Sequence, residues 1–404
     1  MRHIVYAALV LAPVAALAAF GGVFSAPTPS AAATPALAMA RPCDGHCRRD
    51  WMDTSLRLNQ LQLVGTEASY KQRPGSGALT IIRMGGRAGE DALNFGEPAL
   101  AQQLDGGVRA LGFDIANDPR GGAYAHPAIS GMAMELLDDD YLAAMKQPGF
   151  KTIHVIDVDY RSSCPALKQC LQQVAAWSRA HPAHLPIVIT LRPNTAKTPM
   201  PGATTPVAFD AAALEALDSD VRGIFQAGEI VTPDQVQGTH DSLRQAVMAG
   251  GWPKLGAARG KVLFVLDGGA DVARLYQGAR TSLQGRAMFV AVTEASPLAA
   301  FVAIADPAGD ADRIAAAVKA GFIVSTRADD ETREARLYDT ERRDAAFASG
   351  AQIVNSDFAA ADPAIGPYRV SLKDNPAALC GAALAPDACV RFTDTGKMLT
   401  AALP

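Results

Sequence analysis

The sequence has few aromatic residues and no large excess of either charge. Phe, Trp and Tyr make up 6% of its 404 residues, and 37 Lys and Arg stand against 41 Asp and Glu, for a formal net charge of −4. A broad basic surface for nucleic acid is therefore excluded, although a local basic patch is not. The scarcity of aromatic side chains also argues against a surface on which bases stack. We therefore expect no nucleic-acid partner.

Nucleotide-binding signatures are missing as well. The sequence has no Gly-x-Gly-x-x-Gly turn after its first predicted strand and no P-loop. Open, doubly wound sheets that bind nucleotides usually carry one of these turns. The chain is nonetheless 49% hydrophobic and 19% charged, which is typical of a globular protein.

Long hydrophobic runs are confined to the start of the chain. Arg2 precedes the nearly continuous apolar run Ala7–Ala19, and small residues then offer Ala-x-Ala cleavage after Ala38 or Ala40. Residues 1–40 are typical of a signal peptide, with an uncleaved anchor helix as the alternative. We therefore expect a periplasmic or secreted protein, and we expect any contact with a membrane to be peripheral.

The six cysteines fall into three close pairs. These are Cys43/Cys47, Cys164/Cys170 and Cys380/Cys389. Short, even pairings in an exported chain predict three disulfides that close small loops. Zinc binding is the alternative, since His46 lies inside the first pair, but a zinc site would need further ligands nearby in the fold.

Short apolar runs alternate with helical patterns along the rest of the chain. The runs are rich in Val, Ile, Leu and Phe, as in strands that are buried on both faces. The predicted strands are Leu61–Gly65, Leu111–Ile115, Thr152–Asp157, Ile187–Arg192, Lys261–Leu266, Ala287–Val292, Phe322–Arg327 and Gln352–Asn355. Apolar residues at three- and four-residue spacing predict the helices Pro98–Leu104, Glu135–Lys146, Pro165–Ala180, Ala211–Phe225, Thr239–Ala249, Ala311–Ala320 and Glu331–Ala348.

Eight strands that alternate with helices predict a (β/α)8 barrel of the TIM type, in the α/β class. We expect the barrel over residues 41–361 and a loop-rich tail over 362–404, with an open doubly wound sheet as the alternative. Catalytic side chains of such barrels lie at the carboxyl ends of the strands. The polar residues expected there are Glu67, Asp114, Asp157, Asp159, Arg192, Asp267, Arg327, Asp329 and Asp357. Each could equally be a helix cap, a turn residue or half of an ion pair.

Several segments, spread in order over nearly all of the mature chain, match the motifs of one family. They are Leu58–Thr66, Glu67–Lys71, Leu104–Arg109, Gly112–Ile115, His154–Cys164, His181–Ile187, Gly251–Pro253, Arg259–Lys261, Thr326–Asp329 and Ala345–Gln352. With these segments the chain resembles the bacterial calcium-dependent phosphoinositide phospholipase C family.

The resemblance implies a phosphoric diester hydrolase on a phosphodiesterase-type barrel. In the family, a His-Asn pair follows the first strand, a Glu and an Asp lie on the second, and a Glu lies on the fourth. The His is an acid/base residue, the Asn and the carboxylates hold calcium, and a second catalytic His follows the second strand. Calcium lowers the pKa of the inositol 2-hydroxyl, which attacks the phosphorus while diacylglycerol leaves.

Most of these positions differ in this chain. The family's His-Asn pair is matched by Glu67-Ala68, its second-strand Glu by Gly112 and its fourth-strand Glu by Arg192. Calcium takes six to eight oxygen ligands, and a neighbouring guanidinium would repel it by on the order of several kcal/mol. We therefore expect no calcium and no other cofactor, with Asp114 the only retained candidate calcium ligand.

The same resemblance suggests the remaining roles. The second catalytic His is matched by His126. His154 is the alternative, but its place within a predicted strand is more typical of a packed core histidine. Asp114, Lys71 and Arg327 are expected to bind substrate.

Two functional hypotheses follow. In the first, hydrolysis is reduced, altered or lost, and the chain is an exported binding or structural protein; the number of replaced positions favours this. In the second, the chain is a metal-independent phosphodiesterase in which Arg192 replaces the calcium charge, Glu67 is the base and His126 the acid. Both hypotheses predict a phosphoinositide-like or other phosphodiester small molecule as the partner.

Overall fold

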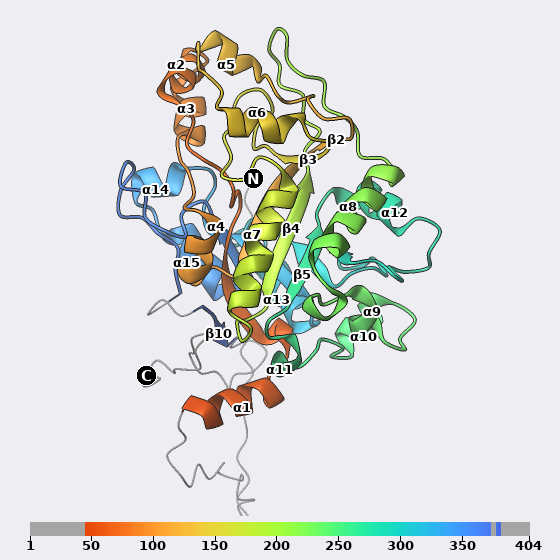
Figure 1. Ribbon diagram of the computed structural model, residues 1–404. Helices are drawn as coiled ribbons and strands as arrows, with labels where there is room; N and C mark the ends of the chain where they lie inside the picture. Colours follow the sequence, from red (N-terminus) through yellow and green to blue (C-terminus); the bar gives the residue numbers. More distant parts are fainter. Residues whose placement is uncertain (1–44, 373–376, 381–404) are drawn as a thin grey trace, which may run out of the picture. The chain divides into compact units, whose positions relative to one another are not determined.

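Eight parallel strands form the centre of the molecule (Figure 1). The computed structural model describes residues 45–372 and 377–380, so the predicted signal peptide lies outside the described part. The strands are β1 (Leu61–Thr66), β2 (Ala110–Asp118), β4 (Ile187–Pro193), β5 (Val262–Leu266), β6 (Met288–Val290), β7 (Phe301–Ala303), β8 (Ile323–Arg327) and β9 (Ile353–Ser356).

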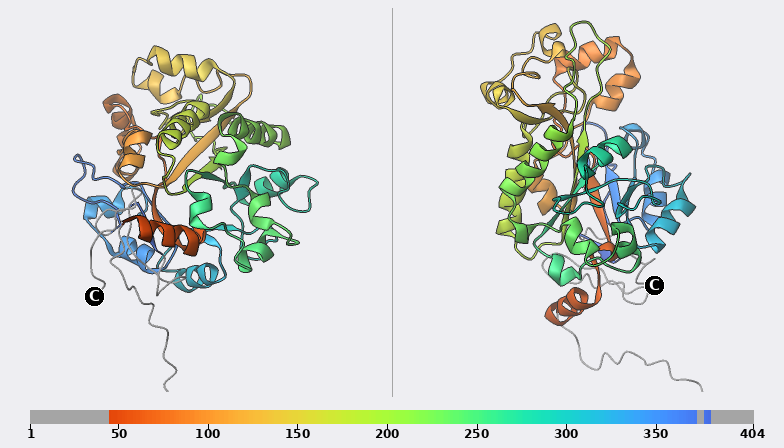
Figure 2. Two further views of the ribbon diagram at one scale, coloured as in Figure 1. Left: turned by 60° about the horizontal axis from the view of Figure 1, so that its bottom comes forward. Right: turned by 90° about the vertical axis from the view of Figure 1, so that its right-hand side faces the viewer.

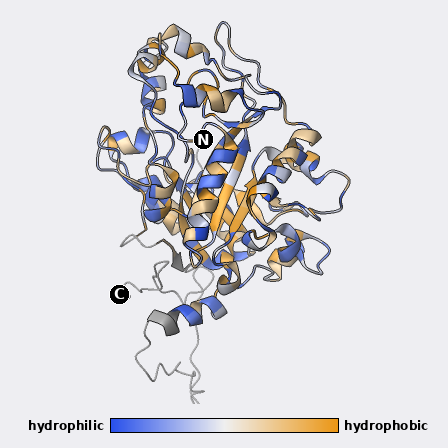
Figure 3. Ribbon diagram, viewed as in Figure 1, coloured by the Kyte–Doolittle hydropathy of each residue, from blue (hydrophilic) through white to orange (hydrophobic). Residues whose placement is uncertain are grey.

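The strands close on themselves into a barrel. They pair in the order β6-β5-β4-β2-β1-β9-β8-β7, and every neighbouring pair on this path is parallel. A single parallel bridge between Ala291 and Phe301 joins the two ends of the path. The strands are apolar, as Figure 3 shows for β4 and β5, and β5 is buried at every residue. The predicted (β/α)8 barrel is therefore confirmed.

Helices surround the strands (Figure 2). Most are short, and most of those long enough to pack along the barrel present one apolar face to it. They are α1 (Gly45–Ser55), α2 (Ser76–Met84), α3 (Arg87–Leu93), α4 (Leu100–Asp105), α5 (Ala128–Met132), α6 (Asp139–Lys146), α7 (Leu167–Ala180), α8 (Ala211–Ile224), α9 (Pro233–Gln237), α10 (Leu243–Met248), α11 (Leu255–Ala258), α12 (Gly269–Gln277), α13 (Ala311–Lys319), α14 (Arg333–Leu337) and α15 (Glu341–Ala348).

One predicted barrel strand is wrong. Over Thr152–Asp157 the chain leaves β3 (Gly149–Thr152), which pairs antiparallel with the far end of β2, and continues as a loop. Asp157 even adopts a left-handed conformation, with φ of 68°. The place of this strand in the barrel is taken by β7, a three-residue strand in an Ala-rich segment that was not predicted. The apolar pattern of 152–157 arises because the loop side chains pack beneath α6 rather than in the barrel.

The loop after β3 is held by a disulfide between Cys164 and Cys170, which confirms one predicted pair. Cys170 lies in the first turns of α7, and both cysteines are buried. The bond therefore ties the loop to a helix that packs on the barrel. The other two predicted pairs include residues outside the described part of the chain.

The Cys164–Cys170 bond should contribute to stability by restricting the unfolded chain. Replacing Cys164 by Ala should lower the free energy of unfolding by about 2 kcal/mol, as expected for a short closed loop. Urea unfolding measures this loss. Cys170→Ala and the double variant should lose the same amount, because each removes the same bond; clearly additive losses would show that side-chain packing dominates instead.

Candidate active site

A cavity opens at the carboxyl ends of the barrel strands. It has a volume of about 620 Å³ and is lined by residues at or just after the ends of β1, β2, β4, β5, β8 and β9. Its polar lining residues are Glu67, Asp114, His154, Arg192, Asn194, Asp267, Arg327, Asp330, Glu331 and Asp357. Barrels of this type place their catalytic residues at this end, so the cavity is the candidate active site.

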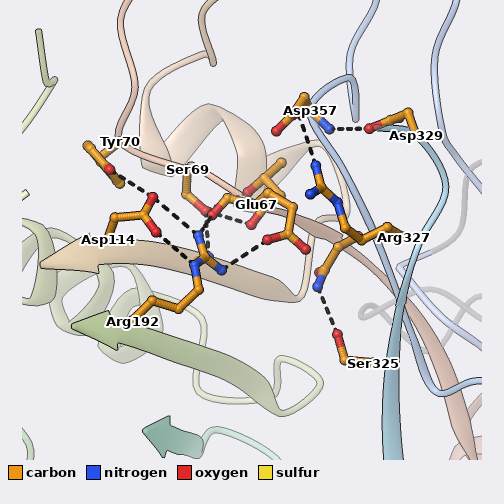
Figure 4. Close-up of polar contacts among 12 residues, drawn as sticks. Glu67, Ser69, Tyr70, Asp114, Arg192, Ser325, Arg327, Asp329 and Asp357 are labelled. Atoms are coloured by element: carbon orange, nitrogen blue, oxygen red, sulfur yellow. Dashed lines mark hydrogen bonds and ion pairs between the residues drawn. The ribbon is translucent and has the colours of Figure 1, made fainter. Parts of the chain in front are cut away.

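Arg192 makes the central polar contacts of this cavity (Figure 4). From the end of β4, its Nε donates to Asp114 Oδ1 at 2.8 Å, and its Nη1 lies 3.0 Å from Glu67 Oε2. Its Nη2 donates to the backbone carbonyl of Glu67 and lies 3.4 Å from Asp114 Oδ2. Tyr70 also donates its hydroxyl to Asp114 Oδ2, at 3.0 Å. The guanidinium is therefore engaged on all three of its nitrogens.

Gly112 on β2 makes room for this guanidinium. A Cβ at position 112 would lie 2.8 Å from Nη1 and 3.0 Å from Nη2 of Arg192, and closer still to the Glu67 carbonyl. Any side chain at this position would therefore displace Arg192. Gly112 and Arg192 are matched: one residue leaves a space that the other fills.

The charges of this cluster stabilise one another. Burial alone would raise the pKa of Asp114, but the charge and hydrogen bonds of Arg192 hold that pKa below its ordinary value. Burial alone would lower the pKa of Arg192, but Asp114 and Glu67 raise it. Asp114 and Arg192 therefore remain ionised over the whole physiological pH range.

The described side chains at this position do not fit a calcium ion. Calcium needs six to eight oxygen ligands, whereas the two carboxylates here, Glu67 and Asp114, already pair with a guanidinium. Within residues 45–372 and 377–380, no three His, Cys, Asp or Glu side chains are grouped so that they could hold a metal ion.

A second cation, Arg327 at the end of β8, is less fully engaged. Its Nη2 lies 3.5 Å from Asp357 and its Nη1 lies 3.7 Å from Asp330, and its buried Nε has no hydrogen-bond partner. Behind it, the backbone N–H of Asp357 donates to Asp329 at 3.0 Å. Arg327 is therefore the cation in the cavity with donors to spare for an anionic ligand.

Burial shifts the two carboxyl groups beside Arg327. It raises the pKa of Asp357 to about 6, although Arg327 opposes the shift. Burial and the charge of Asp357 together raise the pKa of Asp329. Near neutral pH this side of the cavity therefore holds carboxyl groups that are poised to take up a proton.

His154 faces the cavity from the loop after β3. Its Nδ1 lies 2.9 Å from Asp159 Oδ2, and the same carboxylate oxygen lies 3.1 Å from the buried Lys71 Nζ. Burial would lower the pKa of His154, but the hydrogen bond and charge of Asp159 raise it above its ordinary value. An imidazole oriented through Nδ1 in this way leaves Nε2 for a ligand, which is the arrangement of a general acid or base.

The structure brings together some of the residues predicted from the sequence. Glu67, Asp114, Arg192 and Arg327 all line the cavity. His126 does not: it is exposed, in the segment between β2 and α5. Lys71 is fully buried behind the cavity, where it donates to the carbonyls of Leu93 and Phe95.

His154 lines the cavity, although the sequence favoured a packed core role for it. Its assignment to a strand made a core role more plausible, although the structure places it on a loop at the cavity. The spacing between His154 and Asp159 was the available signal. Asn194 and the apolar residues Ala92, Leu93 and Phe95 also line the cavity, and no pattern in the sequence singled out the three apolar residues.

Removing Arg192 should be costly because it leaves two carboxylates in the cluster without a partner. Arg192→Met should lower the free energy of unfolding by about 3 kcal/mol, as measured by urea unfolding. Adding Glu67→Gln and Asp114→Asn should restore part of the loss, because no uncompensated charge then remains. Arg274→Met is the control: it breaks an exposed pair with Asp271 and should cost less than about 1 kcal/mol.

Binding of a phosphodiester in this cavity should strengthen as the pH falls. Below the raised pKa of Asp357, about 6, this carboxyl loses its charge and no longer competes for Arg327. Titration calorimetry with glycerophosphoinositol between about pH 8 and about pH 5 measures the change, since a phosphodiester keeps its charge over this range. Asp357→Asn should bind more tightly at about pH 8 and should show a weaker pH dependence, of which the titration of His154 supplies the remainder. A native chain whose affinity is constant over the range would contradict the prediction.

Comparison with known proteins identifies the family. Residues 56–381 match the model of "Phosphoinositide phospholipase C, Ca2+-dependent". A search of curated proteins found no match.

Solved structures with a similar fold include two calcium-dependent phospholipases C. The enzyme from Pseudomonas sp. is 17% identical, with a TM-score of 0.48 over 78% of this chain and 94% of the other. The enzyme from Streptomyces antibioticus is 16% identical, with a TM-score of 0.46 over 75% and 95%. Because the family model covers most of the sequence, the chain belongs to the calcium-dependent phosphoinositide phospholipase C family.

Proposed function

We propose that this chain is a phospholipase C-like protein that has lost calcium-dependent cleavage and binds a phosphodiester headgroup in its cavity. The observation that supports this most directly is the position of Arg192. Its guanidinium lies between Glu67 and Asp114, and these residues match positions that hold calcium or a catalytic His in the family. The cation that pairs with both carboxylates is therefore supplied by the chain itself.

This internal cation does not act as calcium does. A calcium ion keeps open coordination positions for the substrate oxygens, whereas each nitrogen of Arg192 already has an oxygen partner. Glu67 is likewise held in an ion pair, which disfavours its taking a proton from a hydroxyl. The cluster therefore stabilises the barrel mouth, and it offers little assistance to an attacking hydroxyl.

The cavity does, in contrast, contain groups that are suited to binding a phosphodiester headgroup. Arg327 has terminal nitrogens whose ion pairs are long, at 3.5 and 3.7 Å, and these can bind a phosphate. Asn194, His154 and Asp267 also line the cavity and can bond to hydroxyl groups. A headgroup that combines a phosphodiester with several hydroxyls, such as inositol phosphate, fits this set.

A metal-independent phosphodiesterase is the second candidate, and His154 favours it. The pair with Asp159 holds the imidazole at the cavity with a raised pKa. In this version His154, rather than the exposed His126, would donate the proton to the leaving group. The attacking hydroxyl would need a base, and Asp357 suits that role, because its ion pair with Arg327 is long, at 3.5 Å, and burial raises its pKa to about 6.

We also propose that the protein acts outside the cytoplasm. The features of residues 1–40 are those of a signal peptide, and the Cys164–Cys170 disulfide is typical of an oxidising compartment. No helix in the described ranges is long and apolar enough to cross a bilayer.

Hydrolysis assays separate the two candidates. Purified mature protein is incubated with phosphatidylinositol and with glycerophosphoinositol, in calcium and in chelator. We expect no turnover that depends on calcium, together with calorimetric binding of glycerophosphoinositol. Calcium-dependent turnover would overturn the proposal.

The second candidate predicts turnover that the chelator does not change. That turnover should fall by about 10²-fold or more in His154→Ala and stay unchanged in the control His126→Ala. If His126→Ala loses activity instead, the acid assigned from the sequence is the correct one.

A further inference from the structure

A second hollow adjoins the candidate active site. It has a volume of about 440 Å³ and lies at the carboxyl ends of β5, β6 and β7, beside α12. Asp267, directly after β5, lines both this hollow and the candidate active site. The two spaces therefore meet at one residue on the same edge of the barrel.

The walls of the second hollow are mainly apolar. Ala273 on α12, Ala291 after β6 and Leu298 before β7 are buried and line it. Val292 and Ala303 also line it. These side chains offer contact area and no hydrogen bonds, which suits a hydrocarbon group.

The two arginines around this hollow are already paired. Arg274 pairs with Asp271 on the same helix, and Arg313 Nε donates to Glu294 at 2.7 Å. Neither guanidinium therefore needs an anionic ligand. This distinguishes the hollow from the candidate active site, where the ion pairs of Arg327 are longer, at 3.5 and 3.7 Å.

A polar and an apolar space that share one wall residue suit a ligand with two unlike parts. We infer that the second hollow binds the hydrocarbon chain of a single-chain amphiphile whose phosphodiester headgroup lies in the candidate active site. The inference rests on the proposed function, because it takes the headgroup site from there. It adds a chain-binding subsite and, with it, a preference for lipids with one chain over the free headgroup.

Asp267 lies where the headgroup and the hydrocarbon chain of such a ligand would be joined. Its side chain is half-buried at the wall that the two spaces share. In a single-chain glycerolipid, a glycerol hydroxyl lies between the phosphate and the acyl chain. Asp267 is placed to accept a hydrogen bond from such a hydroxyl.

The test compares one headgroup with and without a chain. Titration calorimetry measures binding of glycerophosphoinositol and of a lysophosphatidylinositol with a chain of about eight carbons, used below its micelle concentration. We expect the chain to tighten binding at least about tenfold, because burying two or three methylenes is enough for that change.

Two variants fill the hollow from opposite sides. Ala270, the second residue of α12, and Ala303, the last residue of β7, both line it and are both exposed, so larger side chains should not prevent folding. Ala270→Trp and Ala303→Trp should each abolish the gain from the chain and leave glycerophosphoinositol binding unchanged. Ala212→Trp is the matched control, since Ala212 is also the exposed second residue of a helix, α8, and it should keep the gain.

The outcomes separate this inference from the proposed function. Equal affinity for the two ligands, with clear binding of both, would overturn the inference and leave the headgroup site intact. A gain that persists in both hollow-filling variants would also overturn it, since the chain would then bind elsewhere. Failure of both ligands to bind the native chain would overturn the proposed function together with the inference.

Discussion

The double ion pair of Arg192 with Glu67 and Asp114 organises the mouth of this barrel. Arg192 lies near the end of β4, Glu67 directly follows β1 and Asp114 lies within the neighbouring β2, and their charges meet over the space left by Gly112. A charge is costly to bury alone, so both carboxylates depend on Arg192, and Arg192 depends on them. Replacing Arg192 alone would therefore leave two carboxylates of the cluster without their cation.

Because buried charges need partners, the two sides of the cavity differ in character. On the β1–β2–β4 side, opposite charges neutralise one another and hold the strand ends together. On the β8–β9 side, Arg327 faces Asp357 and Asp330 at longer distances, and burial disfavours the charged form of Asp357. The first side is structural in character and the second is available to a ligand. A protein that binds without cleaving needs only the second.

Much of the fold and part of the candidate site can be predicted from the sequence. The strands and site residues that cannot be predicted have identifiable physical causes. The apolar runs locate seven of the eight barrel strands, because strands that are buried on both faces have a continuous hydrophobic signal. The apolar runs do not predict β7, which is only three residues long. They wrongly predict a strand at Thr152–Asp157, where an apolar segment forms a loop. Motif positions identify Glu67, Asp114 and Arg192. The approach of His154 to the cavity depends on how the chain returns from β3, which no local pattern encodes.

The closure of the barrel has a consequence for its flexibility. Most strand pairs share several residues in register, whereas β6 and β7 meet through the one bridge between Ala291 and Phe301. Few backbone hydrogen bonds must therefore break for β6 and β7 to separate. Ala291 also lines the apolar hollow beside α12. The single-bridge contact between β6 and β7 thus borders that hollow. The width of the hollow can therefore change while the strand pairs that hold the charged cluster stay intact.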